Sequence, residues 1–213
     1  RLDDQAVLLR HFFHGFGNEI LVSALPKQSR LKQIWLRNYI ESRGGFEATW
    51  SALQEFVRQI EEASRGEFRI SEQMELRLWR GTIYFEGNIP QYEEKIPHLV
   101  LDCKAGFSLR LPTGRLNLSR DKTSDALAFK CPQSLSLSPS SEVQSLRHLG
   151  KEKSLKMLFV EKNVPPWRRK NWPVLNCEDG PIIIPNIAVN DDHWVDMTKR
   201  GDQSIRYLSF TTT

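Results

Sequence analysis

The segment GKEKSLKMLFVEKNVPPWRRKNW, residues Gly150–Trp172, decides how the chain folds around its most charged part. Between residues 147 and 172 the chain has eight lysines and arginines and only two glutamates, a net charge of +6. The whole chain carries +4, so the remainder sums to −2 and the basic character is local. A basic patch of this kind is typical of a surface that binds a polyanion, and a solvated basic face is the plain alternative.

This segment predicts a short amphipathic helix. Leu155, Leu158 and Phe159 fall at positions i, i+3 and i+4, which form one apolar stripe. Lys153 and Lys156 fall on roughly the opposite side. They lie near the N-terminal end of the helix, where the helix dipole disfavours cations by about 0.3–1 kcal/mol. A nucleic-acid phosphate bound at that end would remove the conflict.

A double proline is expected to end this helix. Pro165–Pro166 excludes helical geometry for the residues before it, so the helix ends by about Asn163, which can take the left-handed C-cap. The prolines then present Trp167 beside the basic run Arg168–Lys170. Trp167 could stack on RNA, although a core anchor is the commoner role for a tryptophan in such a turn.

Taken in order, these features resemble the C-terminal domain of the tRNA(Ile)-lysidine synthetases. In that family a Lys-Ser-Leu-Lys helix runs into a Pro-Pro-Trp turn, an arginine and a Pro-x-Leu strand. Before the helix the family usually has a glycine-rich, arginine-bearing segment, where this chain has Arg147–Gly150. The matching positions are Lys153–Lys156, Phe159, Pro165–Trp167, Arg169 and Pro173–Leu175.

A second region resembles the central domain of the same family, so the resemblance covers most of the chain. The family has an arginine-rich Leu/Trp helix there, followed after a second helix by an Arg-x-x-Arg-Gly strand pair. The matching positions in this sequence are Arg30, Leu31, Trp35, Leu36, Arg37, Arg77, Arg80–Gly81 and Ile83–Tyr84.

The resemblance implies ATP-dependent adenylation of C2 of the wobble cytidine in an isoleucine tRNA. The amine of free lysine then displaces AMP, which leaves lysidine and changes decoding from AUG to AUA. In the family, ATP with Mg²⁺ and lysine are bound by a further N-terminal domain that has a Ser-Gly-Gly-x-Asp-Ser loop. This chain has no such loop, and its nearest string, Ser42–Gly45, lacks the Asp-Ser. We therefore expect the non-catalytic, tRNA-recognising C-terminal part of the enzyme, with no catalytic residue, cofactor or metal site of its own.

Phosphate contacts fix the register of a protein on RNA, whereas stacking and base-edge contacts discriminate between sequences. The resemblance implies that the C-terminal domain holds the acceptor stem of tRNA(Ile), with lysines on backbone phosphates and arginines in bidentate contacts. The central domain then lies along the tRNA body nearer the anticodon. The candidate tRNA-binding residues are Lys151, Lys153, Lys156, Arg168, Arg169 and Lys170 in the C-terminal domain and Arg30, Arg37 and Arg43 in the central domain.

The sequence predicts an α+β protein whose first domain spans residues 1–86. Helices near 25–42 and 49–64, the second with Thr49 as its N-cap, are expected to form a hairpin. Short strands at 67–70, 75–79 and 82–86 follow, with Arg80–Gly81 at a turn. The predicted core stripes are Leu31, Ile34, Trp35 and Tyr39 on the first helix and Trp50, Leu53, Val57 and Ile60 on the second.

Residues 87–98 are the expected linker, and residues 99–213 the expected C-terminal domain, a small mixed α/β sheet with one basic helix. The serine-rich stretch 131–145 is expected to be a mobile loop, and the acidic tract Asp191, Asp192 and Asp196 a solvated one. Strands are predicted at 107–111, 116–118, 126–130, 172–176, 182–189 and 205–210.

The composition is globular, with 213 residues of which 39% are hydrophobic and 26% charged. Cys103, Cys131 and Cys177 are odd in number and include no CxxC, which favours free thiols in a reducing cytosol over disulfides or zinc. The longest apolar-rich run, 181–189, is too short to span a bilayer, so we expect a cytoplasmic protein without a membrane segment. Residue 1 already lies in an apparent helix, which indicates a fragment; His11 and His14 on it lack further metal ligands.

Two other interpretations stay open at this point. The first is a protein-interaction module whose basic helix docks an acidic partner. The second is a self-contained hydrolase, which is disfavoured because Asp102, Glu178 and the five histidines show no triad or metal spacing. The parent enzyme could also be a homodimer.

Overall fold

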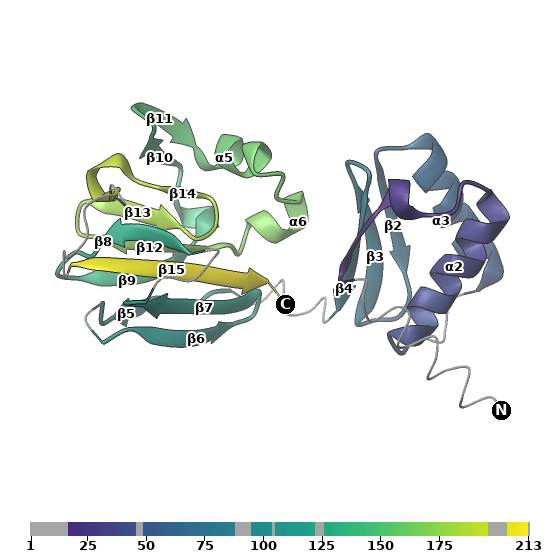
Figure 1. Ribbon diagram of the computed structural model, residues 1–213, viewed down its shortest axis with the longest axis horizontal. Helices are drawn as coiled ribbons and strands as arrows, with labels where there is room; N and C mark the ends of the chain where they lie inside the picture. The colour runs from purple at the N-terminus through teal and green to yellow at the C-terminus, as the bar shows by residue number, and fades with distance from the viewer. Residues whose placement is uncertain are drawn as a thin grey trace. The chain divides into compact units, whose positions relative to one another are not determined.

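The computed structural model describes residues 17–45, 49–87, 95–103, 105–121, 126–195 and 204–212. The chain divides into an N-terminal unit, Arg1–Pro90, and a C-terminal unit, Gln91–Thr213 (Figure 1). The predicted α+β class is confirmed, since both units combine antiparallel sheets with a few helices.

The N-terminal unit is a four-stranded antiparallel sheet with two helices on one of its faces (Figure 1). The strand order is β1-β4-β3-β2, and the core lies between this sheet and the helices, around Leu36, Tyr39, Phe56 and Leu76. The elements are β1 (Glu19–Leu21), a 3-10 turn (Val22–Ala24), α2 (Ser29–Ser42), α3 (Trp50–Glu62), β2 (Arg65–Arg69), β3 (Met74–Trp79) and β4 (Thr82–Gly87).

In this unit, local sequence signals predicted most ends of the helices and strands to within two residues. The Oγ1 atom of Thr49 accepts a hydrogen bond from the backbone N–H of Ala52 at 3.3 Å, which confirms the N-cap of α3. Arg80 and Gly81 have φ angles of 47° and 76°, the left-handed pair expected for a two-residue hairpin turn, and they join β3 to β4. Helix α2 begins at Ser29 rather than near Leu25.

The predicted core stripes are partly wrong. Leu31 and Ile34 are 46% and 41% exposed, because α2 buries the face that carries Leu36, Tyr39 and Ile40 instead. That face also holds Lys32, whose ammonium pairs with Glu61 of α3 at 2.6 Å. A lysine can occupy the inner face only because this carboxylate is there, and residue periodicity does not reveal such a partner.

Two more N-terminal expectations need comment. Trp50 is 43% exposed, since it occupies the first position of α3, at the end of the helix rather than over the core. Residues Glu19–Leu21 form an edge strand, β1, beside β4, which the sequence did not predict. The expected helix near the N-terminus, with His11 and His14, lies outside the described residues.

The C-terminal unit has two antiparallel sheets and a separate β-hairpin instead of the single mixed sheet that was predicted. The sheets have the orders β14-β13-β12-β9-β5 and β6-β7-β15-β8, and both contribute to one apolar core. The elements are β5 (Leu99–Leu101), β6 (Phe107–Leu111), β7 (Gly114–Ser119), β8 (Leu127–Lys130), β9 (Leu135–Pro139), a 3-10 turn (Ser140–Glu142), β10 (Ser145–His148), β11 (Lys151–Ser154), α5 (Leu155–Glu161), α6 (Pro166–Arg169), β12 (Pro173–Cys177), β13 (Gly180–Ile184), β14 (Ala188–Val189), a 3-10 turn (Asp191–His193) and β15 (Ile205–Thr212).

The serine-rich stretch is not a loop, and this expectation was wrong. It contains β9, an inner strand that pairs with β12 on one side and β5 on the other. Leu135 and Leu137 alternate with serines at the two-residue period of a strand and are buried at 1% and 0% exposure. The alternation was visible in the sequence, but the serine content was read as a loop signal.

Two further predictions for this unit are corrected. The single strand expected at 182–189 is two strands, because the chain turns at Pro185–Ile187, where Asn186 has a φ of 61°. Cys103 and Cys131 are joined as a disulfide, with Cα atoms 6.3 Å apart, and Cys177 is free. The fold brings together the ends of β5 and β8, and a sequence separation of 28 does not show that proximity.

Candidate nucleic-acid interface

The basic segment is a hairpin followed by a helix, rather than one basic helix. Residues Lys151–Ser154 form strand β11, paired with β10, and the helix α5 begins only at Leu155. The Oγ atom of Ser154 accepts the N–H of Met157 at 3.3 Å and caps α5. Of the lysines assigned to the helix, only Lys156 lies in its first turn, so the predicted conflict with the helix dipole is confined to that residue.

The end of α5 agrees with the sequence. Asn163 has a φ of 53°, so the left-handed residue predicted after the helix is confirmed. Pro166 then occupies the first position of the short helix α6, where its missing N–H costs nothing. In Figure 1 the hairpin β10–β11, α5 and α6 follow one another along one edge of the C-terminal unit.

Trp172, rather than Trp167, anchors this edge to the core. Its Nε1–H donates to the carbonyl of Pro185 at 3.0 Å. Its ring makes edge-on contacts with Phe159 at 6.0 Å and Phe210 at 5.1 Å between ring centroids. Trp167 is only half-buried. Trp172, together with the buried Leu158 and Phe159 of α5, therefore fixes this edge to the core.

The structure separates the predicted cations into buried and exposed ones. Arg168 is 6% exposed, so its side chain is poorly placed for the bidentate contact to tRNA that was expected of it. Arg169 is half-buried, and its Nε–H donates to the carbonyl of Val164 at 2.8 Å. The short helix α6 turns both side chains inward, a direction that its sequence does not specify. Lys170, at the C-cap of α6, is exposed.

Lys153 is also committed within the protein. Its ammonium lies 2.9 Å from a carboxylate oxygen of Glu161, and its side chain is 17% exposed. In the register of the hairpin Lys153 pairs with the buried Leu146, so its stem lies on the inner face of β11. Alternation along the strand places neighbouring residues on opposite faces. The expected use of Lys153 as a phosphate contact is therefore not supported by its position.

Four lysines of the segment remain as exposed cations. Within the part of the chain that the structure describes, none of them makes an ion pair. Arg147 joins them on β10 with a side chain that is 59% exposed, 4.0 Å from a carboxylate oxygen of Asp191. The charge count of the segment included Lys162 and Arg147, but neither was named as a candidate. The four lysines are Lys151, Lys156, Lys162 and Lys170.

The acidic tract is not simply a solvated loop. The two carboxylate oxygens of Asp191 accept the backbone N–H groups of Leu149 and Gly150, each at 2.8 Å. Asp191 therefore fixes the turn between β10 and β11 from a position more than forty residues later in the chain. Asp192 is exposed, and Asp196 lies outside the described residues.

In the N-terminal unit the three candidate arginines differ in their contacts. Arg30 is exposed, and Arg37 pairs with Glu41 one turn later at 2.8 Å. Arg43 stacks over the rings of Tyr39 and Phe85, at 5.2 and 5.8 Å from the ring centroids. It also donates to the carbonyl of Gly17 at 3.2 Å, so it connects the end of α2 to the start of β1. Arg30 is the candidate with the fewest internal contacts.

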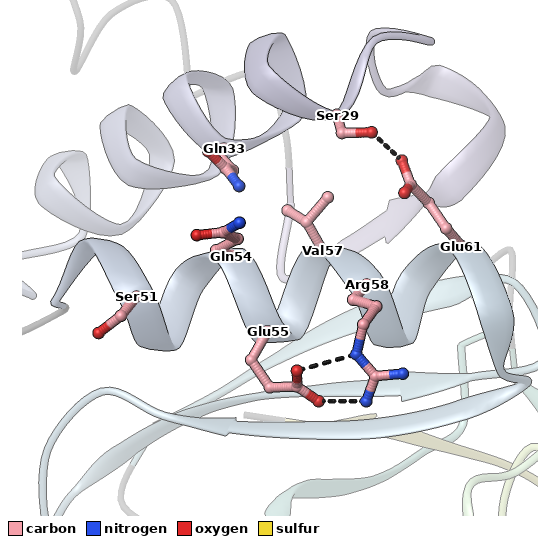
Figure 2. Close-up of a pocket in the computed structure, with 8 residues that line it drawn as sticks. All are labelled: Ser29, Gln33, Ser51, Gln54, Glu55, Val57, Arg58 and Glu61. Atoms are coloured by element: carbon pink, nitrogen blue, oxygen red, sulfur yellow. Dashed lines mark hydrogen bonds and ion pairs between the residues drawn. The ribbon is translucent and has the colours of Figure 1, made fainter.

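A groove of about 310 Å³ runs between α2 and α3, and all of its lining residues except Val57 are polar or charged (Figure 2). Glu61 lies at one end, where hydrogen bonds from Lys32 and then Ser29 hold the pKa of Glu61 below its ordinary value. Glu55 lines the other side, and the bond from Arg58 lowers its pKa as well. Both carboxylates stay ionised at neutral pH, so this groove disfavours a polyanion.

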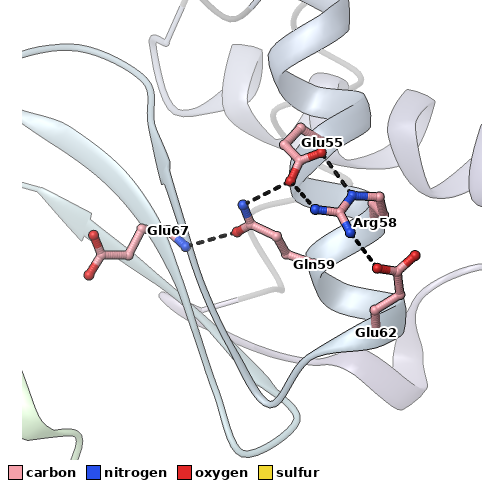
Figure 3. A network of polar contacts seen from close by, with 5 residues as sticks. All are labelled: Glu55, Arg58, Gln59, Glu62 and Glu67. Carbon is pink, nitrogen blue, oxygen red and sulfur yellow. Dashed lines mark hydrogen bonds and ion pairs between the residues drawn. The ribbon is translucent and has the colours of Figure 1, made fainter.

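The outer face of α3 holds a polar network that joins the helix to β2 (Figure 3). Arg58 bridges Glu55 and Glu62, and Gln59 donates to Glu55 at 3.4 Å. The Oε1 atom of Gln59 accepts the backbone N–H of Glu67 at 3.2 Å. The positive charge of Arg58 is thus neutralised internally, and the network has a structural role.

The described residues contain no group of three or more His, Cys, Asp and Glu side chains that could hold a metal ion. No helix within the described ranges is long and apolar enough to cross a membrane.

Comparisons with known proteins bear on the C-terminal unit. Residues 134–205 match the family model described as the TilS substrate C-terminal domain, a range that includes all six C-terminal candidates. The tRNA(Ile)-lysidine synthases of two Vibrio cholerae serotype O1 strains, O395 and N16961, are each 28% identical over 125 residues. The alignment covers 59% of this chain and 25% of each relative, so the chain spans about a quarter of the length of the curated relatives that it matches.

A solved structure, described as a crystal structure of the TILS C-terminal domain, aligns with 17% identity and a TM-score of 0.41. The alignment covers 55% of this chain and 98% of that chain. The family model and the curated relatives agree with the motifs at 153–175. Residues 134–205 therefore match the TilS substrate C-terminal domain, and the resemblance of this chain to the tRNA(Ile)-lysidine synthases is confirmed.

Proposed function

We propose that this chain is a tRNA-recognising C-terminal part of a tRNA(Ile)-lysidine synthetase. The observation that carries the proposal is the set of exposed lysines at 151, 156, 162 and 170, which lie inside the matched domain. In this proposal they contact backbone phosphates of tRNA(Ile), while Arg168 and Lys153 keep the supporting structure together. The parent enzyme would ligate lysine to C2 of the wobble cytidine with ATP, and ATP, Mg²⁺ and lysine would be bound outside this fragment.

The expected contribution of the lysines is electrostatic. Each phosphate that a lysine neutralises releases condensed counterions, so affinity falls as salt rises. Four such contacts correspond to a slope of about −3 in a plot of log K against log salt. These contacts position the RNA without reading its sequence, so discrimination among tRNAs has to come from other groups.

In the same proposal the N-terminal unit lies along the tRNA body nearer the anticodon, and the C-terminal unit holds the acceptor stem. Arg30 is the N-terminal candidate best placed for a phosphate, since it is exposed and within the described ranges makes no ion pair. Arg37 is less available for a phosphate because it forms an ion pair with Glu41. Arg43 is less available because it donates to the carbonyl of Gly17 and stacks over Tyr39.

The proposal is tested by tRNA binding across a salt series with charge-matched variants. Lys151→Gln with Lys156→Gln removes two of the proposed contacts, and Lys95→Gln with Lys130→Gln removes two exposed lysines outside the segment. The first pair is expected to lower the affinity for tRNA(Ile) about tenfold and to make the salt slope about 1.5 units shallower. The control pair should do neither. Equal effects of the two pairs would mean that only the total charge matters, and the proposal would fail.

A protein-interaction role is the second candidate, because the outer face of α5 has an apolar pair. Met157 and Val160 are 54% and 36% exposed. A partner protein would bury these two side chains, whereas a phosphate backbone would not. Met157→Ser should therefore leave tRNA affinity unchanged if the first proposal holds. A loss of tRNA affinity as large as that of the lysine pair would instead favour an apolar contact on this face.

A further inference from the structure

The turn of the β10–β11 hairpin contains a leucine in a conformation that leucine rarely adopts. Leu149 has a φ of 55° and Gly150 a φ of 74°, and together they connect the paired residues His148 and Lys151. Turns of this kind favour Asn, Asp or Gly at both positions, because a bulky side chain is strained at positive φ. The side chain of Leu149 is 73% exposed, so burial within the protein does not offset the strain.

The turn is also held unusually firmly for a hairpin tip. Asp191 accepts both turn amides at 2.8 Å, one with each carboxylate oxygen. The Nδ1 atom of His148 lies 2.9 Å from the carbonyl oxygen of Val189 on β14. The tip is therefore tied to the sheet at two points, and an exposed leucine is presented at a fixed position. A strained residue that its surroundings hold in place is a pointer to function.

Cations flank this leucine on both strands, and Arg147 lies opposite Glu152 in the hairpin register and 4.0 Å from a carboxylate oxygen of Asp191. Lys151 follows the turn and is exposed, and Arg147 on the other strand is 59% exposed. An apolar side chain flanked by cations matches the two surfaces of a nucleic acid, the anionic backbone and the flat faces of the bases. Inside a stem both faces of each base pair are stacked and inaccessible, but the last pair of an open stem exposes one face.

We propose that Leu149 packs on the terminal base pair at the open end of an RNA stem, while Lys151 and Arg147 contact the flanking phosphates. Leu149 would then set where the stem stops against the protein, a positioning role that a phosphate contact cannot provide, because phosphates repeat along the strand. This inference rests on the proposed tRNA-binding function and adds to it the structural feature that the hairpin recognises.

The test compares Leu149→Asn with wild type on two RNAs of the same stem sequence. One has an open blunt end, and the other is closed by a loop at both ends. Asparagine is favoured at positive φ, so the variant keeps the turn and its melting temperature should be unchanged or higher. The affinity for the open stem is expected to fall about tenfold, as for the loss of a half-buried leucine, with an unchanged salt slope. The affinity for the closed stem should not change.

Val100→Thr is the matched control, since Val100 is 88% exposed in the same unit and lies outside the hairpin. Its affinity for both RNAs should equal that of wild type. The inference is overturned if Leu149→Asn binds the open stem like wild type, or if it loses the same affinity for both RNAs. Failure of the wild-type chain to bind either RNA would overturn the proposed function itself, so the two failures are distinguishable.

Discussion

Asp191→Ala is the change that most directly tests how the hairpin is held. In the folded protein the Asp191 carboxylate accepts the N–H groups of Leu149 and Gly150, each at 2.8 Å. Alanine removes both acceptors and leaves two turn amides to water. The sequence placed this aspartate in a solvated acidic loop, where its loss would have no effect on folding.

The expected loss of unfolding free energy in Asp191→Ala follows from these two hydrogen bonds. A hydrogen bond to a charged group contributes roughly 1.5–3 kcal/mol. The side chain of Asp191 is 29% exposed and the turn amides can be rehydrated, so we expect about 2 kcal/mol for the pair rather than the full sum. For a unit of this size that corresponds to a drop in melting temperature of about 8 °C.

Thermal unfolding by circular dichroism measures the loss, and amide hydrogen exchange locates it. The Leu149 and Gly150 amides should exchange faster in Asp191→Ala, whereas amides of the central strand β12 should change only by the global difference. Asp192→Ala is the control, because that neighbouring side chain is exposed. Asp191→Asn should fall between them, since it keeps one acceptor. Equal melting temperatures for the Asp191→Ala and Asp192→Ala variants would refute the stabilising role of the Asp191 hydrogen bonds to the turn.

Three further outcomes are expected. Gly66→Ala should lower the stability of the N-terminal unit by about 1 kcal/mol in urea unfolding. The new Cβ would lie 2.6 Å from Oε1 of Gln59, the oxygen that accepts a hydrogen bond from β2 in Figure 3. The control Gly87→Ala, whose Cβ meets nothing within 4 Å, should not change the stability. Glu61→Gln should lower the free energy of unfolding by up to about 1 kcal/mol at pH 7, because hydrogen bonds from Lys32 and Ser29 lower the pKa of Glu61. This stability is present above the unfolded pKa of about 4.5 and is lost as the pH falls below it. A difference in unfolding free energy between variant and wild type that persists at pH 3 would contradict the assignment. Arg168→Ala should lower the melting temperature, because it empties a buried position, and a stable variant with weakened tRNA binding would show that the arginine acts at the surface after all.

Structural features that depend on neighbouring residues could be predicted from the sequence, whereas features that depend on residues far along the chain could not. The turn at Arg80–Gly81 and the cap at Thr49 depend on residues within a few positions, and such signals are readable from sequence. The strand β9 was missed although its alternation was present, since its serines suggested a loop and its partners β5 and β12 lie far along the chain. The periodicity of α2 predicts Leu31 and Ile34 in the core, but the buried face carries Lys32 instead, whose ammonium pairs with Glu61 of α3.

For the candidate interface, the sequence by itself determined the basic segment, the left-handed Asn163 after its helix and the resemblance of residues 134–205 to the TilS substrate C-terminal domain. These depend on composition, on local backbone preferences and on motif order. Only the tertiary structure decided which cations face solvent, because exposure depends on partners that arrive from elsewhere in the fold. Lys153 forms an ion pair with Glu161, and Arg168 is buried in the interior. Asp191 fixes the hairpin turn that contains the exposed Leu149.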